Sequence, residues 1–191
     1  MIKKINFTKI FLDAISDCPE YFEALKIVKE NSSGKIWLIG GFVFRTLASQ
    51  LYDLPNPECD LDFIVEKVSS DFVLPAGWKI KSSRFGNPKF AKNNKEIDLV
   101  PIEEVYSISK RKFKPTIENY LTGTPLNIQS IAFDVIKHKI IGDVGIKSLI
   151  DREIRIYNLD LARFAAEKKN INLKKMILDK ANDLKFKPIL P

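Results

Sequence analysis

The sequence predicts an α+β fold, with a mixed sheet and segregated helices. Apolar residues at helical spacing fill both ends of the chain, whereas short strand-like runs gather in the middle. The order is helix, strand, helix, then a group of strands and then helices, which differs from the regular alternation of a doubly wound parallel sheet. The length of 191 residues suits one domain of ordinary size, or a domain with a short helical appendage.

The two ends of the chain are predicted to be helical, with N-terminal helices over residues 1–34 and a C-terminal helical extension over 157–191. Apolar residues recur at helical spacing across 7–30. Pro19 is expected to begin a second helix there, because proline fits the first turn of a helix. The spacing is again helical over 145–188.

The segment between these ends, residues 35–156, is predicted to form the core of the fold. The apolar run 35–39 predicts a buried strand, Gly40-Gly41 ends it, and a helix is expected over 42–52. The other elements expected here are strands at 60–66, 78–82, 89–91 and 96–101 with turns at 85–88 and 92–95, a short helix at 116–121, and a hairpin made of 128–135 and 139–141.

The composition excludes several classes of protein. No run of about 18 apolar residues occurs, so no transmembrane helix is expected, and the N-terminus lacks the pattern of a signal peptide. Cys18 and Cys59 are too few for a disulfide framework or a zinc site. The single histidine, His138, excludes chemistry that needs a histidine pair. A cytoplasmic location, which is reducing, is expected.

The positive charge lies in the second half of the chain. Residues 1–109 carry 14 Lys and Arg against 15 Asp and Glu, whereas residues 110–191 carry 17 against 9. Such an excess favours a polyanionic partner, with nucleic acid first. The alternative is that a lysine-rich surface serves only solubility.

The first feature that points to chemistry is Gly40-Gly41, between a predicted strand and a predicted helix. Glycines there let the backbone approach a ligand closely. The free N–H groups and the positive dipole end of the following helix suit a phosphate chain. The alternative is a plain tight turn.

Two later segments carry paired carboxylates. Residues two apart on a strand share a face, so Asp60 and Asp62 point the same way, as do Glu96 and Asp98 on another predicted strand. Adjacent carboxylates repel each other and resist burial, and a divalent cation such as Mg²⁺ relieves that repulsion. If the two strands are neighbours, three carboxylates form a two-metal site for phosphoryl transfer. The alternative for each segment is a solvated acidic strand.

Four features follow one another along the chain: Gly40-Gly41, a helix, Asp60-Leu61-Asp62, and a later strand with Asp98. This arrangement resembles the nucleotidyltransferase domain of the DNA polymerase beta superfamily. The closer similarity is to the head domain of bacterial poly(A) polymerases and tRNA nucleotidyltransferases, in a stand-alone form. The segment 125–134 resembles the Asn-containing strand segment of that family, and 140–143 resembles the hairpin return that follows it.

The resemblance implies a nucleotidyltransferase fold and an enzyme that moves a nucleoside monophosphate from a nucleoside triphosphate to an acceptor hydroxyl, releasing pyrophosphate. After the glycine turn the family usually has Val, Arg and Asp, whereas here Val43 is followed by Phe44 and Arg45, and Arg45 is expected to supply a cation near the phosphates. The nucleotide-binding residues implied are Gly40, Gly41, Arg45 and Asn127. The residues implied to be catalytic and to bind two Mg²⁺ ions are Asp60, Asp62 and Asp98.

The acceptor is expected to be an RNA 3′ end, with tRNA first, because of the basic second half of the chain. The cations expected to contact RNA are Lys110, Arg111, Lys112, Arg152 and Arg155. Two alternatives stay open. One is a nucleotidyltransferase of the toxin or antibiotic-resistance type, which acts on a protein or a small molecule. The other is a catalytically silent domain that binds nucleic acid.

Overall fold

Seven strands form one mixed sheet in the order β3-β4-β5-β2-β1-β6-β7. It is seen in a computed structural model that describes residues 5–55, 60–82 and 86–190. The strands are β1 (Ser32–Ile39), β2 (Leu61–Val68), β3 (Lys79–Ser82), β4 (Pro88–Lys92), β5 (Lys95–Pro101), β6 (Ala132–Asp134) and β7 (Lys139–Ile141). β2 and β5 run parallel, whereas the other neighbouring strands are antiparallel. The mixed sheet confirms the predicted α+β class.

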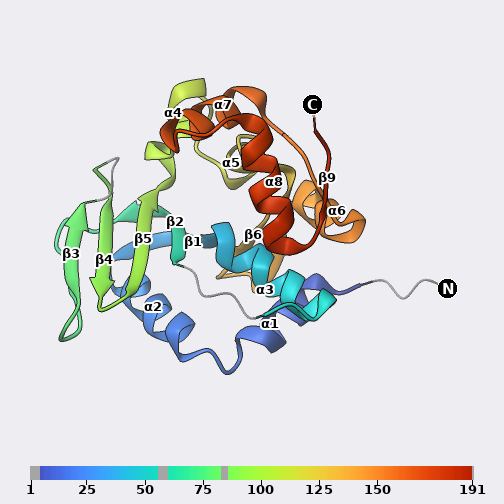
Figure 1. Cartoon of the computed structure of the whole chain (residues 1–191). Helices are drawn as coiled ribbons and strands as arrows, with labels where there is room; N and C mark the ends of the chain where they lie inside the picture. Colours follow the sequence, from blue (N-terminus) through green and yellow to red (C-terminus); the bar gives the residue numbers. More distant parts are fainter. Residues whose placement is uncertain (1–4, 56–59, 83–85, 191) are drawn as a thin grey trace.

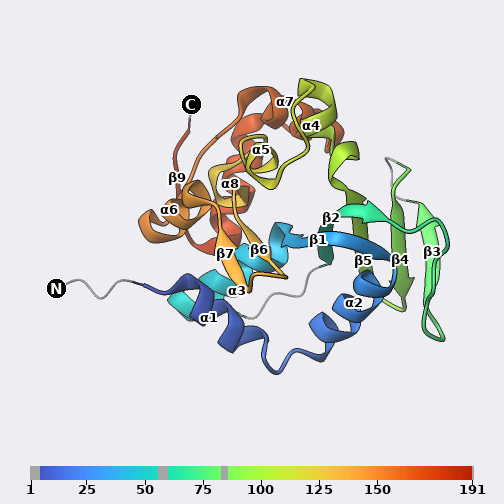
Figure 2. The same cartoon turned by 180° about the vertical axis from the view of Figure 1, so that it is seen from behind.

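Helices cover both sides of this sheet. They are α1 (Phe7–Ile15), α2 (Pro19–Glu30), α3 (Gly40–Tyr52), α4 (Tyr106–Arg111), α5 (Ile117–Leu121), α6 (Asp143–Asp151), α7 (Leu159–Lys168) and α8 (Leu173–Leu184). Two opposite views place α1 and α2 on one side of the sheet and α4, α5 and α7 on the other (Figures 1 and 2). None of the helices in the described part of the chain is long and apolar enough to cross a membrane.

The N-terminal helices form as their sequence predicts. The Asn6 side chain accepts a hydrogen bond from the Lys9 backbone N–H and so caps α1. Pro19 is the first residue of α2, which confirms the predicted break. α3 begins at Gly40, two residues earlier than expected, so the glycine pair forms the start of the helix rather than a separate turn.

Several boundaries differ from the prediction. β1 begins at Ser32, so the expected boundary after residue 34 falls inside a strand; the polar Ser32 and Ser33 join it by pairing with Val68 and Lys67. The hairpin was expected to begin at residue 128, but Asn127–Gln129 is a 3₁₀ helix and β6 starts later. The predicted turn at 85–88 lies partly outside the described residues.

The segment 145–188, predicted to be helical, is helical only in part. It is interrupted by β8 (Glu153–Ile154), and it ends in β9 (Lys187–Pro188), which pairs with β8 in parallel. The 3₁₀ turn Ile102–Glu104 and the helix α4 were not predicted. These pieces are too short to show a periodic pattern of their own.

Apolar side chains pack on both faces of the sheet. The larger cluster includes Phe11, Phe63 and Ile177, so all three predicted segments of the chain share one core. The smaller cluster consists of Trp37, Ile64, Ile102, Ile108, Ile117, Leu121 and Ala132. Since Phe63 and Ile64 belong to different clusters, the neighbouring Asp62 faces the same side of β2 as Ile64.

Candidate active site

Two carboxylates lie opposite each other on neighbouring strands. Asp62 of β2 is in register with Asp98 of β5 across their parallel pairing. Paired residues project from the same face of a sheet, so the two side chains stand side by side. The condition set by the sequence, that the two acidic strands be neighbours, is therefore met.

The pKa values of this carboxylate pair are raised. Burial is the main cause for Asp62, and the negative charges of Asp98 and Asp60 add to it, so that the pKa of Asp62 rises to about 7. Burial also raises the pKa of Asp98, although the Lys89 ammonium opposes the rise. Two carboxylates this close cannot both ionise without a compensating cation. The pair therefore favours a bound proton or a bound metal ion.

Gly40 lets Asp62 approach the start of α3. It follows Ile39, which pairs with Asp62 across β1 and β2, and its φ is +76°. A Cβ atom at Gly40 would collide with Asp62 Oδ2. The first residue of α3 must therefore be glycine both for its left-handed backbone and for the carboxylate that lies against it.

Substituting Gly40 by alanine is expected to displace Asp62 and remove activity. The left-handed backbone alone costs about 1–3 kcal/mol of unfolding free energy, and the collision moves the carboxylate. Gly86→Ala is the matched control, because Gly86 has φ +88° with nothing within 4 Å of an added Cβ. Urea unfolding should show a loss of stability in both variants, and a larger loss in Gly40→Ala because of the collision. If the function proposed below holds, only Gly40→Ala should also lose turnover. Equal losses of stability in the two variants would contradict the role given to Gly40.

The carboxylates offer oxygen ligands of the kind that a hard metal ion takes. Within the residues that the structure describes, no group of three or more His, Cys, Asp or Glu side chains is arranged to hold a metal ion. Asp60, which is exposed, lies just before β2, and its charge acts on both Asp62 and Asp98. Asp98 Oδ1 is buried without a hydrogen-bond partner. A buried, unpartnered carboxylate oxygen beside a second carboxylate fits a hard cation such as Mg²⁺. The pair Asp62 and Asp98 has both of these features.

Lys89, which was not predicted as a site residue, contacts the carboxylates. Its Nζ lies 2.6 Å from Glu96 Oε2 and 3.4 Å from Asp98 Oδ2. A signal for this contact was present: a two-residue turn at Asn93-Asn94 sets Lys89 opposite Asp98 in the β4–β5 hairpin. Glu96 shares a face with Asp98, as expected, but its carboxylate binds lysines.

Two predicted nucleotide-binding residues have contacts elsewhere. Arg45 binds Asp183 of α8, with Nη2 2.7 Å from Oδ2, and lines a cavity of about 270 Å³ that Lys169 and Lys180 also line. Asn127 is only 3% exposed. Its Nδ2 donates to the Glu153 carbonyl and its Oδ1 accepts from the Arg155 N–H. These bonds tie 127 to 153–155, and the nucleotide-binding role of Asn127 stays a prediction.

The predicted RNA-contacting residues divide into two groups. The Arg111 guanidinium donates to the carbonyls of Ser107 and Asn119, which joins α4 to α5. Arg152 stacks over Tyr52, 4.7 Å from its ring centroid. Both arginines therefore have structural contacts of their own. Lys110, Lys112 and Arg155 are exposed.

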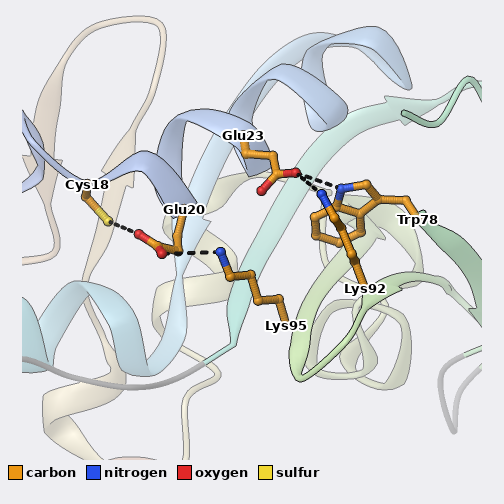
Figure 3. Close-up of polar contacts among 6 residues, drawn as sticks. All are labelled: Cys18, Glu20, Glu23, Trp78, Lys92 and Lys95. Carbon is orange, nitrogen blue, oxygen red and sulfur yellow. Dashed lines mark hydrogen bonds and ion pairs between the residues drawn. The ribbon is translucent and has the colours of Figure 1, made fainter. Parts of the chain in front are cut away.

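A cavity of about 550 Å³ lies beside the N-terminal ends of β2 and β5, next to α2. Figure 3 shows polar contacts of its lining: Glu20 is joined to Cys18 and Lys95, and Glu23 to Trp78 and Lys92. The contacts of Lys92 and Lys95 fasten α2 to the hairpin of β4 and β5. The apolar lining of the cavity includes Leu61 and Ile97, which face away from the carboxylate pair.

No protein-family model matches the sequence, and no curated protein matches it. Solved structures do match. A CCA-adding enzyme in complex with CTP has a TM-score of 0.65 at 16% identity, over 97% of this chain and 44% of the enzyme. The Bacillus stearothermophilus CCA-adding enzyme in complex with CTP has a TM-score of 0.60 at 20% identity, over 90% of this chain and 41% of the enzyme. The Thermotoga maritima CCA-adding enzyme with tRNA has a TM-score of 0.55 at 14% identity, over 92% and 46%.

These matches establish the fold. The chain spans less than half the length of each of these enzymes. At such low sequence identities, the matches show a shared backbone fold and do not show shared chemistry. The predicted resemblance to the nucleotidyltransferase fold of tRNA nucleotidyltransferases is confirmed.

Proposed function

We propose that this protein acts as a nucleotidyltransferase. It moves a nucleoside monophosphate from a nucleoside triphosphate to an acceptor hydroxyl and releases pyrophosphate. The observation that carries the proposal is the Asp62–Asp98 pair, held side by side on parallel strands against Gly40. The structural likeness to CCA-adding enzymes supports it.

Each part of the site has a role in this reaction. Asp62 and Asp98, joined by Asp60, would hold Mg²⁺, which when bound stabilises charge on the attacking and leaving oxygens. No side chain caps α3, so the backbone N–H groups of Gly40 and Gly41 at its start would be available to donate to the β- and γ-phosphates. Asp98 takes the proton from the acceptor hydroxyl. The acceptor oxygen then bonds to the α-phosphorus as its bond to pyrophosphate breaks.

An RNA 3′ end is the acceptor that the charge of the chain favours. All of the net positive charge lies in residues 110–191, and Lys110 and Lys112 at the end of α4 are exposed. Cations of this kind bind phosphates without reading the base sequence. A tRNA is the first candidate among RNAs.

The experiment is incubation of the protein with each labelled triphosphate, Mg²⁺ and total cellular RNA. Label in RNA supports the proposal, and the size of the labelled species identifies the acceptor. Label in protein or in a small molecule would mean that the reaction is as proposed but that the acceptor is not RNA. Absence of transfer with every triphosphate, RNA and protein acceptor would overturn the proposed activity. Asp62→Asn is the negative control.

Neutralising Lys110 and Lys112 together, as Lys110→Gln and Lys112→Gln, is expected to weaken RNA binding and to reduce the log–log salt slope by about 1–2. Triphosphate affinity should stay within about twofold. The control is Lys9→Gln with Lys26→Gln, which removes the same charge from α1 and α2. Filter binding at several salt concentrations measures both. The same slope in the two double variants would exclude this surface from RNA binding.

A further inference from the structure

The two oxygens of Asp98 have different environments. Oδ2 lies 3.4 Å from Lys89 Nζ. Oδ1 is buried and has no hydrogen-bond partner. A carboxylate can rotate and exchange its oxygens, and an ion pair to one of them opposes that rotation. The structure thus distinguishes an oxygen paired with a lysine from one that has no such partner, and Asp62 interacts with the same carboxylate.

Lys89 is itself held in place. It stands opposite Asp98 in the β4–β5 pairing, and its side chain is only 20% exposed. A lysine has a flexible four-carbon stem, so one ion pair alone orients it poorly. Here Glu96 Oε2 lies 2.6 Å from the same Nζ, and Glu96 Oε1 lies 3.4 Å from Lys81 Nζ. Lys89 is therefore held between Glu96 and Asp98, whereas Lys81 pairs with Glu96 alone.

We propose that Lys89 is a positioning residue of the candidate active site, which holds Asp98 Oδ2 so that Oδ1 is the oxygen that works on the acceptor side. This inference rests on the proposed function. Glu96 acts only through Lys89, which explains why two acidic residues on one strand face serve different purposes. Lys89 contacts neither the triphosphate nor the acceptor in this role.

The test compares Lys89→Met with Lys81→Met. Both variants remove an ammonium bound to Glu96, but only Lys89 also contacts Asp98. Three measurements are needed: kcat and the KM for triphosphate, the affinity of the metal-free protein for Mn²⁺ by electron paramagnetic resonance, and urea unfolding. A pH of 8.5 keeps proton competition small, because the pKa of Asp62 is about 7.

Lys89→Met should lower kcat at least about tenfold with the KM for triphosphate within about threefold. Mn²⁺ should bind at least as tightly as in the wild type, because a positive charge beside the carboxylates is gone. Lys89→Arg should restore part of kcat, and Lys81→Met should stay within about twofold of wild type. Slower turnover with unweakened metal binding is a combination that general damage to the site does not produce.

Two results would overturn the inference. One is wild-type kcat in Lys89→Met while Asp98→Asn is inactive. The other is a parallel loss of Mn²⁺ binding, stability and turnover, which would make Lys89 a structural residue. A failure of the proposed function looks different, because then the wild type transfers nothing or Asp98→Asn remains active.

Discussion

Replacing Asp62 by asparagine is expected to lower the rate of nucleotidyl transfer by about a thousandfold or more, and to stabilise the metal-free protein at pH 8. The pKa of Asp62 is raised from an ordinary 3.8 to about 7, mainly by burial. The folded state therefore prefers the protonated acid, and ionisation destabilises it as the pH rises from about 4 through about 7. Asparagine removes that charge, so its advantage should be small at pH 4 and reach about 2–4 kcal/mol at pH 8.

Urea unfolding with a chelator, across pH 4 to 8, measures this difference. Asp71→Asn is the control, because Asp71 is an exposed acid at the surface. Mg²⁺ should stabilise the wild type and leave Asp62→Asn unaffected. If the variant were less stable than wild type at pH 8, Asp62 would be a structural residue. Transfer near the wild-type rate would exclude it from catalysis.

Asp98→Asn is expected to lower kcat about a hundredfold or more, with a much smaller effect on the KM for triphosphate. Asp98 acts on the acceptor, so its loss affects the transition state more than triphosphate binding. Glu96→Gln should lower kcat by no more than about fivefold, because Glu96 binds Lys81 and Lys89.

Steady-state kinetics of the two variants at saturating Mg²⁺ decide between them. The two residues lie on the same face of one strand, so each is the control for the other. The reverse ranking would make Glu96 the third catalytic carboxylate. Equal losses would mean that the whole strand edge, rather than one side chain, supports turnover.

Much of the site follows from local rules that a sequence displays. The alternation in 60–66 predicts one face for Asp60 and Asp62, and the alternation in 96–101 predicts one face for Glu96 and Asp98. In the structure β2 begins at Leu61, so Asp60 lies just before the strand. A glycine pair between a strand and a helix indicates a close approach of backbone to another group. Each of these patterns is contained in a few neighbouring residues, which is why they could be predicted.

The sequence by itself predicted which strand face carries Asp62, Glu96 and Asp98, and that a glycine pair lies between a strand and a helix; that Gly40 must be glycine follows from its backbone and from Asp62 in the structure. Only the tertiary structure decided that Asp62 pairs with Asp98, because pairing of β2 with β5 depends on hydrogen bonds between segments far apart in the chain. The tertiary structure also decided which of several possible partners each polar side chain binds. Asn127 forms hydrogen bonds with the backbone of 153–155, and Arg45 forms an ion pair with Asp183. A long or polar side chain can bond whatever packing brings within reach, and packing is a property of the whole fold.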